Sequence, residues 1–270
     1  MTYALKTPTI FDVYEGEYPV KFAQMNPKPL ANIFRASWQK LGSRVRGIDT
    51  KAVEYVTTNR TLGIKCGLYH FLTPNGIAEQ AALFLSQWNK VGGVELAPIV
   101  DVEVDLAAPF ANGGYAGTVG NAVWQGHIKT FLDLIASGTG RTPIIYTNRN
   151  FWSFAMTKQG VLQQLAPPVW TKDYYLWLGW YPTYPDNFSA PPASVMPAGW
   201  DKWALWQWED GGRQNGYLAN DLNIPSDWYA LELGLANPPP PEPPPPVPVA
   251  EWPEKLVAHR GTETKDYFHA

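Results

Sequence analysis

Two carboxylates stand two positions apart in an otherwise apolar segment of the sequence. Asp101 and Glu103 interrupt the run Ala97-Pro98-Ile99-Val100-Asp101-Val102-Glu103-Val104. Because side chains two apart on a β-strand share a face, both carboxyl groups are expected on one face of a buried strand. Their repulsion raises the pKa of at least one, which suits a general acid near neutral pH. A solvated strand end or a salt-bridged pair is the alternative, although the local sequence offers no basic partner.

Three further polar side chains lie next to predicted strands. Asp12 ends the apolar segment Ile10-Phe11-Asp12-Val13-Tyr14, His70 ends a second strand, and Asp201 directly precedes a third. In a parallel barrel the carboxyl ends of all strands open onto one mouth, where Asp12 and the Asp101/Glu103 pair could converge. Taken alone, each aspartate is more often a cap or loop residue, and a lone histidine is more often structural.

Other reaction classes find little support in the sequence. The four histidines have no ligand-like spacing, so we expect no metal site. No Gly-x-Ser-x-Gly motif is present, and the single cysteine, Cys66, lies in an apolar run typical of a buried thiol. No glycine-rich phosphate loop follows a predicted strand, and we expect no cofactor. The net charge of −3 gives no general attraction to nucleic acid.

Seven apolar segments with strand character alternate with helical ones. The strands are predicted over Thr9–Tyr14, Leu30–Ser37, Gly63–Leu72, Leu96–Val104, Thr142–Thr147, Tyr174–Tyr181 and Lys202–Trp208. Helical spacing of apolar residues predicts helices over Ile77–Trp88 and Val119–Ile135. This alternation favours the α/β class, with a TIM-like (β/α) barrel preferred to an open sheet. No convincing long helix separates the last strands, so we expect an irregular barrel whose last strands lack regular helices.

A proline-rich segment divides the chain near its carboxyl end. Residues 237–249 contain two runs of four prolines, which favour extended polyproline II structure. We therefore predict one barrel domain over residues 1–236, a linker over 237–249 and a short polar, poorly ordered tail over 250–270. A proline-rich docking ligand is the alternative to a plain linker.

The amino-terminal segment Met1–Pro8 lacks the apolar core of a signal peptide. No stretch approaches the roughly 20 apolar residues that span a bilayer, so we expect no membrane insertion. The 13 tryptophans and 14 tyrosines suit a cleft that stacks on the apolar faces of sugar rings. A bulky aromatic core is the alternative.

An ordered series of short motifs resembles glycoside hydrolase family 25, the Chalaropsis-type lysozymes that are common in bacteriophage endolysins. The motifs are Phe11-Asp12-Val13, Phe34–Ser37, Gly67–Phe71, Asp101-Val102-Glu103, Tyr146-Thr147, Trp177–Tyr181, Trp206-Gln207-Trp208 and Asp221-Leu222-Asn223. The resemblance covers Pro8 to Trp228. It implies an irregular barrel enzyme that cleaves the β-1,4 bond between N-acetylmuramic acid and N-acetylglucosamine in peptidoglycan.

The resemblance also implies roles for individual residues. Glu103 is the implied general acid, and Asp101 is its close carboxylate neighbour. Asp12 and Asp201 take the two further acidic positions of the cleft, Asp201 standing five residues before Trp206. The expected substrate-binding residues are Tyr69, His70, Tyr146, Trp180 and Trp206. Attack by a carboxylate, by water or by the substrate's N-acetyl group stays open.

Two segments depart from the family pattern. Ile10-Phe11-Asp12-Val13-Tyr14-Glu15-Gly16 stands where the family start reads Gly-Ile-Asp-Val-Ser followed by Gln-Gly, and Arg35–Gln39 replaces Lys-Ala-Thr-Glu-Gly. These changes put the subsite contacts near Asp12 in doubt. Rival functions are a non-catalytic wall-binding module, a phage structural component and a hydrolase of another polysaccharide such as chitin. We expect a monomer, and a phage endolysin would reside in the host cytoplasm before release to the wall.

Overall fold

The computed structural model describes residues 10–17, 20–25, 28–41, 44–104, 121–156, 162–183, 189–212, 220–226 and 229. The predicted linker over 237–249 and tail over 250–270 lie outside these residues, so the predicted domain boundaries stay predictions. Within the described parts of the chain, no helix is long and apolar enough to cross a membrane.

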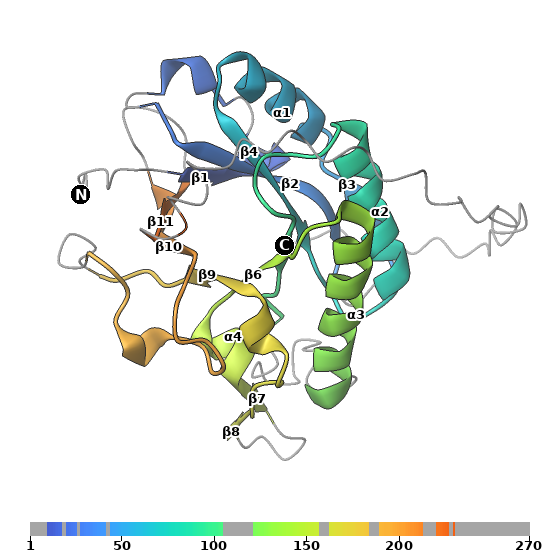
Figure 1. The fold of residues 1–270 in the computed structure, drawn as a ribbon, viewed down its shortest axis with the longest axis vertical. Coiled ribbons are helices and arrows are strands. Elements are labelled where there is room, and N and C mark those ends of the chain that lie inside the picture. The colour runs from blue at the N-terminus through green and yellow to red at the C-terminus, as the bar shows by residue number, and fades with distance from the viewer. Residues whose placement is uncertain are drawn as a thin grey trace, which may run out of the picture.

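Eight strands of the described chain close into a barrel (Figure 1). They are β1 (Ile10–Val13), β2 (Ala31–Gln39), β4 (Lys65–Phe71), β5 (Ile99–Asp101), β6 (Ile144–Thr147), β9 (Tyr175–Gly179), β10 (Leu205–Gly212) and β11 (Asn220–Pro225). Their order is β1-β11-β10-β9-β6-β5-β4-β2, and pairing of β1 with β2 completes the ring. Every pairing between them is parallel except those of β11, which runs antiparallel to both of its neighbours.

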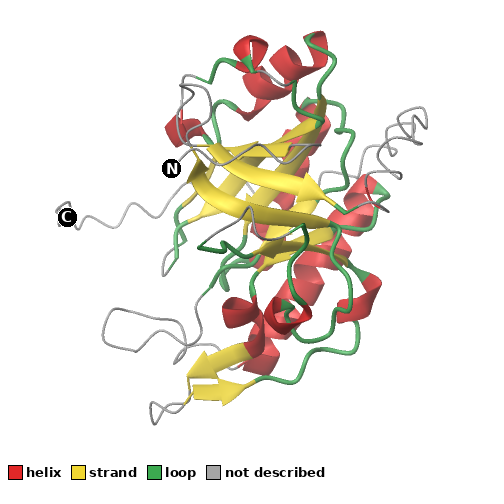
Figure 2. Cartoon of the chain, turned by 90° about the vertical axis from the view of Figure 1, so that its left-hand side faces the viewer, coloured by secondary structure: helices red, strands yellow, loops and turns green. Residues whose placement is uncertain are grey.

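The helices cover the barrel unevenly. Figure 1 shows α1 (Ala52–Thr61), α2 (Ile77–Lys90) and α3 (Asn121–Thr139) along one side, and Figure 2 shows helices flanking the strands from another direction. Around β9, β10 and β11 the described chain has only the short α4 (Arg149–Ser153) and 3₁₀ turns at Thr171–Asp173 and Ala193–Val195. Two further 3₁₀ turns follow β1, at Glu15–Glu17 and Phe22–Gln24. The predicted irregular barrel is therefore confirmed.

Three short strands of the described chain lie outside the ring. β3 (Arg46–Ile48) pairs with β2 in an antiparallel hairpin. β7 (Phe154–Met156) and β8 (Leu162–Gln164) form a separate antiparallel hairpin, which projects beyond α4 (Figure 1).

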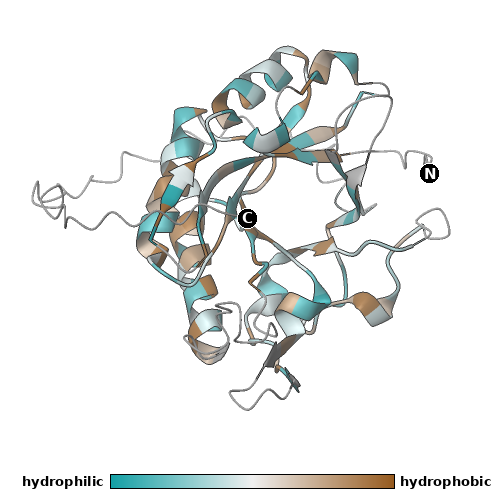
Figure 3. Cartoon of the chain, turned by 180° about the vertical axis from the view of Figure 1, so that it is seen from behind, coloured by the Kyte–Doolittle hydropathy of each residue, from teal (hydrophilic) through white to brown (hydrophobic). Residues whose placement is uncertain are grey.

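Alternate residues of most barrel strands enter two different apolar cores, because successive side chains of a strand point to opposite faces. One core fills the barrel and includes Ile10, Ile33, Ile99, Ile144, Trp177 and Leu205. The other lies between barrel and helices and includes Phe34, Leu68, Phe84, Phe131, Ile145 and Trp206. Hydrophobic and hydrophilic residues accordingly alternate along the helices in Figure 3, as expected for amphipathic helices packed on a barrel.

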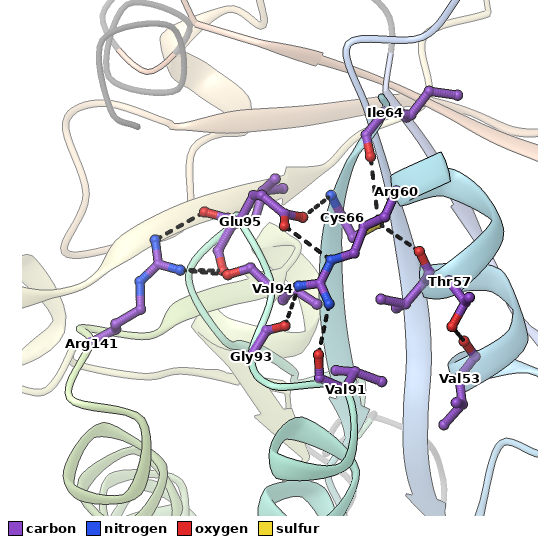
Figure 4. A network of polar contacts seen from close by, with 12 residues as sticks. Val53, Thr57, Arg60, Ile64, Cys66, Val91, Gly93, Val94, Glu95 and Arg141 are labelled. Carbon is purple, nitrogen blue, oxygen red and sulfur yellow. Dashed lines mark hydrogen bonds and ion pairs between the residues drawn. The ribbon is translucent and has the colours of Figure 1, made fainter. Parts of the chain in front are cut away.

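Two arginines hold the loop that leads into β5 (Figure 4). Arg60 donates to the carbonyl oxygens of Val91 and Gly93 and pairs with Glu95 at 3.2 Å. Arg141 donates to Val94 O at 2.8 Å and Leu96 O at 2.9 Å. The Glu95 carboxylate also accepts from the backbone N–H of Cys66, whose thiol is buried as predicted. This network fixes the start of the strand that carries Asp101 at its other end.

The seven predicted strands correspond to β1, β2, β4, β5, β6, β9 and β10, and the two predicted helices to α2 and α3. β11 and α1 were not predicted. β11 reads Asn-Asp-Leu-Asn-Ile-Pro, and its polar side chains conceal a strand pattern. α1 reads Ala-Val-Glu-Tyr-Val-Thr-Thr-Asn-Arg-Thr, which is rich in β-branched residues of low helix propensity.

Candidate active site

Four carboxyl groups meet at the mouth formed by the carboxyl ends of the parallel strands. Asp12 comes from β1, Asp101 ends β5, and Glu103 follows Asp101 by two residues. Asp221 comes from β11 and lies opposite Asp12 in the strand register. Their mutual repulsion links all four: Asp101 is repelled by Glu103 and Asp12, and Asp221 repels both Asp12 and Glu103. The predicted convergence of Asp12 with the Asp101/Glu103 pair is confirmed.

The fourth carboxylate is not the predicted one. Asp201 is exposed and comes before the amino end of β10. The indole of its neighbour Trp200 donates to Tyr174 O, next to the amino end of β9. Asp201 therefore lies at the opposite end of the barrel, and its placement in the cleft was wrong. Asp221 reaches the mouth because β11 runs antiparallel to its neighbours, so its amino end lies where the other strands end.

Two side-chain amides bind the Asp12 carboxyl group. Nε2 of Gln207, on β10, donates to Oδ2 of Asp12 at 2.9 Å and to Oδ2 of Asp221 at 3.0 Å. Nδ2 of Asn223, on β11, donates to the same Asp12 oxygen at 2.6 Å. Neither amide was predicted as a site residue. Strand alternation could have identified both amides as inward-facing. Asn223 shares a strand face with Asp221, and Gln207 lies on the face opposite to Trp206 and Trp208.

Two tyrosines complete this network on the side of β6 and β9. Oε1 of Gln207 accepts from the hydroxyls of Tyr146 and Tyr181, the latter at 2.5 Å, and the two hydroxyl oxygens lie 2.9 Å apart. Burial raises the pKa of both phenols, and the charge of Glu103 adds to the effect. Both hydroxyls therefore stay protonated near neutral pH. A Cβ at Gly179 would lie 2.7 Å from the Tyr146 hydroxyl, so glycine leaves the space this ring needs.

Burial shifts the pKa of the carboxyl pair upward. It raises the pKa of Glu103 to about 7, helped by the charge of Asp221 and opposed by hydrogen bonds with Asp101 and Tyr146. Burial also raises the pKa of Asp101, with repulsion from Glu103 and Asp12 added to it. A carboxyl group that is half protonated near neutral pH can deliver a proton in catalysis.

The two segments that depart from the family pattern contact each other at the rim of the mouth. The Arg35 guanidinium lies 4.5 Å from the centre of the Tyr14 ring and within 3.9 Å of a Glu15 carboxylate oxygen. It also pairs with Asp49 at 3.5 Å. Burial raises the pKa of Glu17 to about 7, and Asp221 adds to this rise. The rim near Asp12 thus contains an ion-pair cluster and a further partly buried carboxyl group.

Two predicted substrate-binding residues face away from the mouth. His70 is fully buried, bonds Ser37 Oγ at 2.8 Å and Gln80 Oε1 at 2.9 Å, and stacks on Phe131 of α3. Trp206 is also fully buried in the layer outside the barrel. Both predictions were wrong for one reason, strand alternation. Tyr69 and Gln207 are the neighbouring residues that point inward.

The remaining predicted contacts lie in or beside the mouth. Tyr69 packs on the barrel core, and the charges of Asp12 and Asp101 add to the rise that burial gives its pKa. Tyr146 belongs to the network around Gln207. Trp180 is partly exposed and stacks on Trp206 with ring centres 5.5 Å apart. Binding of sugar by these three residues stays a prediction, and Tyr181, 43% exposed, joins them.

A barrel mouth that holds buried carboxyl groups beside a carboxylic acid of pKa about 7 suits a glycoside hydrolase, whose chemistry needs paired carboxyl groups. Within the described residues, no group of three or more His, Cys, Asp or Glu side chains is arranged to hold a metal ion. Residues 11–217 match the sequence model of glycosyl hydrolases family 25. The chain belongs to this family.

Several characterised proteins are similar to this chain. The N,O-diacetylmuramidase of a Chalaropsis species is 29% identical over 165 residues, which cover 58% of this chain and 68% of the relative. The spore cortex lytic enzyme SleM of Clostridium perfringens matches in structure with a TM-score of 0.62 and 26% identity, over 83% of this chain and 69% of that one. The muramidase of Acremonium alcalophilum has a TM-score of 0.63 and 22% identity, over 85% of this chain and 98% of that one, and supports the fold.

Proposed function

We propose that this family 25 enzyme hydrolyses the β-1,4 bond between N-acetylmuramic acid and N-acetylglucosamine in peptidoglycan, with Glu103 as the general acid. The observation that carries the proposal is the position of Glu103, whose pKa is about 7, beside the buried Asp101 at the barrel mouth. The similarity to a Chalaropsis muramidase, 29% identical, supports the choice of substrate.

The proposed reaction begins with protonated Glu103, which donates its proton to the glycosidic oxygen as the bond breaks. The sugar acquires positive charge in this oxocarbenium-like transition state. Carboxylates at Asp12 and Asp221 stabilise that charge, and their burial strengthens the electrostatic effect. Glu103 is left as a carboxylate. At the end of the reaction the anomeric carbon is bonded to the oxygen of water, and a proton of that water returns to Glu103.

Analysis of the products of purified peptidoglycan tests this function. Fragments are reduced with borohydride and identified by mass spectrometry. The proposal predicts reduced muramic acid at the new ends, whereas reduced glucosamine would contradict it. Absence of any new reducing end would support the rival wall-binding module, and faster cleavage of chitin than of peptidoglycan would support the rival polysaccharide hydrolase.

We further propose that the enzyme acts as a monomer. All four carboxyl groups and both amides of the site come from one chain. Light scattering should therefore give the mass of one chain at the concentrations used for activity. A dimer that loses activity on dilution would contradict this proposal.

The proposal of a phage endolysin that waits in the host cytoplasm rests on likeness of fold alone. The CTP1L endolysin matches with a TM-score of 0.58 at 17% identity. Expression in a susceptible host should leave cells intact until the membrane is permeabilised, and lysis should follow. Cells that stay intact after permeabilisation would argue against this role.

A further inference from the structure

Two side-chain amides, from β10 and β11, converge on a single oxygen of Asp12. We propose that Gln207 and Asn223 are positioning residues that hold Asp12 as an oriented carboxylate, with Oδ2 occupied and Oδ1 left to face the sugar. This inference rests on the proposed hydrolysis, because it assigns Asp12 to the stabilisation of the charged sugar.

The geometry concentrates the donors on one atom. Oδ2 of Asp12 accepts from Gln207 Nε2 at 2.9 Å and from Asn223 Nδ2 at 2.6 Å. Among the described residues, no donor bonds Oδ1 of Asp12. Two N–H donors favour the ionised carboxylate, and a proton could be added only at Oδ1.

Each amide is itself held in one orientation. The indole N–H of Trp177 donates to Oδ1 of Asn223 at 2.7 Å, and an indole cannot act as an acceptor at that nitrogen. The hydroxyls of Tyr146 and Tyr181 donate to Oε1 of Gln207. Turning either amide over would direct its oxygen at the Asp12 carboxylate. The Trp177 indole therefore fixes which end of the Asn223 amide faces Asp12. For Gln207, whose tyrosine partners could also accept, the Asp12 and Asp221 carboxyl groups that accept from Nε2 fix the orientation.

The amides oppose every other influence on Asp12. Burial, repulsion from Asp221 and repulsion from Glu17 raise its pKa and outweigh the bonds from Asn223 and Gln207, so the pKa of Asp12 lies well above its ordinary value even with both amides in place. The other titratable groups that interact with Asp12 are Asp101, Tyr69 and Tyr181. Arg35 lowers the pKa of Asp101 and Tyr69, although its own ion pairs are with Glu15 and Asp49. Loss of an amide donor should therefore favour protonated Asp12.

Kinetics of amide variants give the first test. Gln207→Met and Asn223→Leu should lower kcat by about tenfold to a hundredfold, the loss expected when a charged group loses a hydrogen bond. The acid limb of the pH profile should move upward by about one unit. Gln80→Met is the matched control, since Gln80 is an equally buried amide in the helix layer. Its acid limb should stay in place, and an equal shift in the control would overturn the proposal.

The tyrosine donors to Gln207 give a second variant with little risk to folding, since Tyr181 is 43% exposed. Tyr181→Phe removes one of the two donors to Gln207 Oε1, so its acid limb should move in the same direction by a smaller amount. If the acid limb of the pH profile stayed in place in Tyr181→Phe and in both amide variants, Gln207 and Asn223 would have a purely structural role.

Nuclear magnetic resonance of the free protein tests the inference without relying on activity. In ¹⁵N-labelled enzyme, the side-chain NH₂ signals of Gln207 and Asn223 are assigned from the two amide variants. Both signals should move when Asp12→Asn is introduced, and the Asn223 signal should lose its pH dependence below neutrality, whereas Gln207 Nε2 still faces Asp221. Signals that stay unchanged in Asp12→Asn would overturn the inference. A positive result with no peptidoglycan hydrolysis would instead contradict the proposed function alone.

Discussion

Asp12 and Asp221 lie opposite each other where β1 pairs with β11, and the amide of Gln207 donates to one oxygen of each at 2.9 and 3.0 Å. The first and last strands of the described barrel thus supply two neighbouring carboxyl groups. Because β11 inserts antiparallel between β1 and β10, this part of the site forms only when the ring closes.

Asp221, rather than Asp201, lies at the barrel mouth, and this placement predicts opposite results for variants of the two residues. Asp221→Asn removes a charge that faces both Asp12 and Glu103, so hydrolysis of peptidoglycan should fall by about tenfold or more. Asp201→Asn changes an exposed residue at the opposite end of the barrel and should leave the rate within about twofold. Initial rates of wall clearance measure both, and the reverse order of effects would refute the placement of Asp221.

The raised pKa of Glu103 predicts how activity depends on pH. A general acid must be protonated, so kcat/KM should fall about tenfold per pH unit above the Glu103 pKa of about 7. Rates on a soluble muropeptide oligomer between pH 5 and pH 10 measure this limb. A rate that stays constant up to pH 9 would be incompatible with Glu103 as the acid.

The same pKa predicts an effect on stability. The folded pKa of about 7 exceeds the ordinary value of 4.5, so the stability linked to protonated Glu103 is present below about 4.5 and is lost as pH rises through 7. Glu103→Gln removes the buried charge and should add about 1–3 kcal/mol to the free energy of unfolding at pH 9, with little change at pH 4. Urea titrations measure the difference, with exposed Glu54→Gln as the control. A variant that is no more stable than the wild type at pH 9 would contradict the shift.

The close approach of Gly179 to Tyr146 predicts the effect of one methyl group. The Cβ of Gly179→Ala would lie 2.7 Å from the Tyr146 hydroxyl, so the ring must move away from Gln207 and Glu103. We expect hydrolysis to fall by about tenfold or more, since small displacements in a site are costly. Gly126→Ala on α3, where no atom lies within 4 Å of the added carbon, is the matched control. Equal rates for the two variants would argue against a positioning role of Tyr146.

The sequence patterns predicted the barrel and the Asp101/Glu103 pair because both depend on local periodicity. Buried strands are recognisable as short apolar runs in the sequence. Because side chains two apart share a strand face, both carboxyl groups were predicted on one face. The errors came from applying that rule incompletely. His70 and Trp206 were chosen for their chemistry, although their neighbours Tyr69 and Gln207 occupy the inward positions.

Asp221 could not be placed in the same way. Its strand is short and polar, and its direction is antiparallel, which depends on how the chain returns to close the ring. A repeating strand–helix pattern predicts only parallel strands. Asp201 was chosen because it stands before a clear strand and five residues before Trp206, although Asp221 belongs to one of the motifs that resemble the family. Pairing between the two ends of the described barrel is a long-range property that local sequence does not specify.

The most direct test of the account is the turnover of Glu103→Gln on purified peptidoglycan at pH 6. The glutamine side chain is nearly the same size and can still form hydrogen bonds, but it cannot transfer a proton to the glycosidic oxygen. New reducing ends should form at least about a hundredfold more slowly than with the wild type, while binding to the wall is retained. Release of reducing ends at a rate near that of the wild type would contradict the assignment of Glu103 as the catalytic acid.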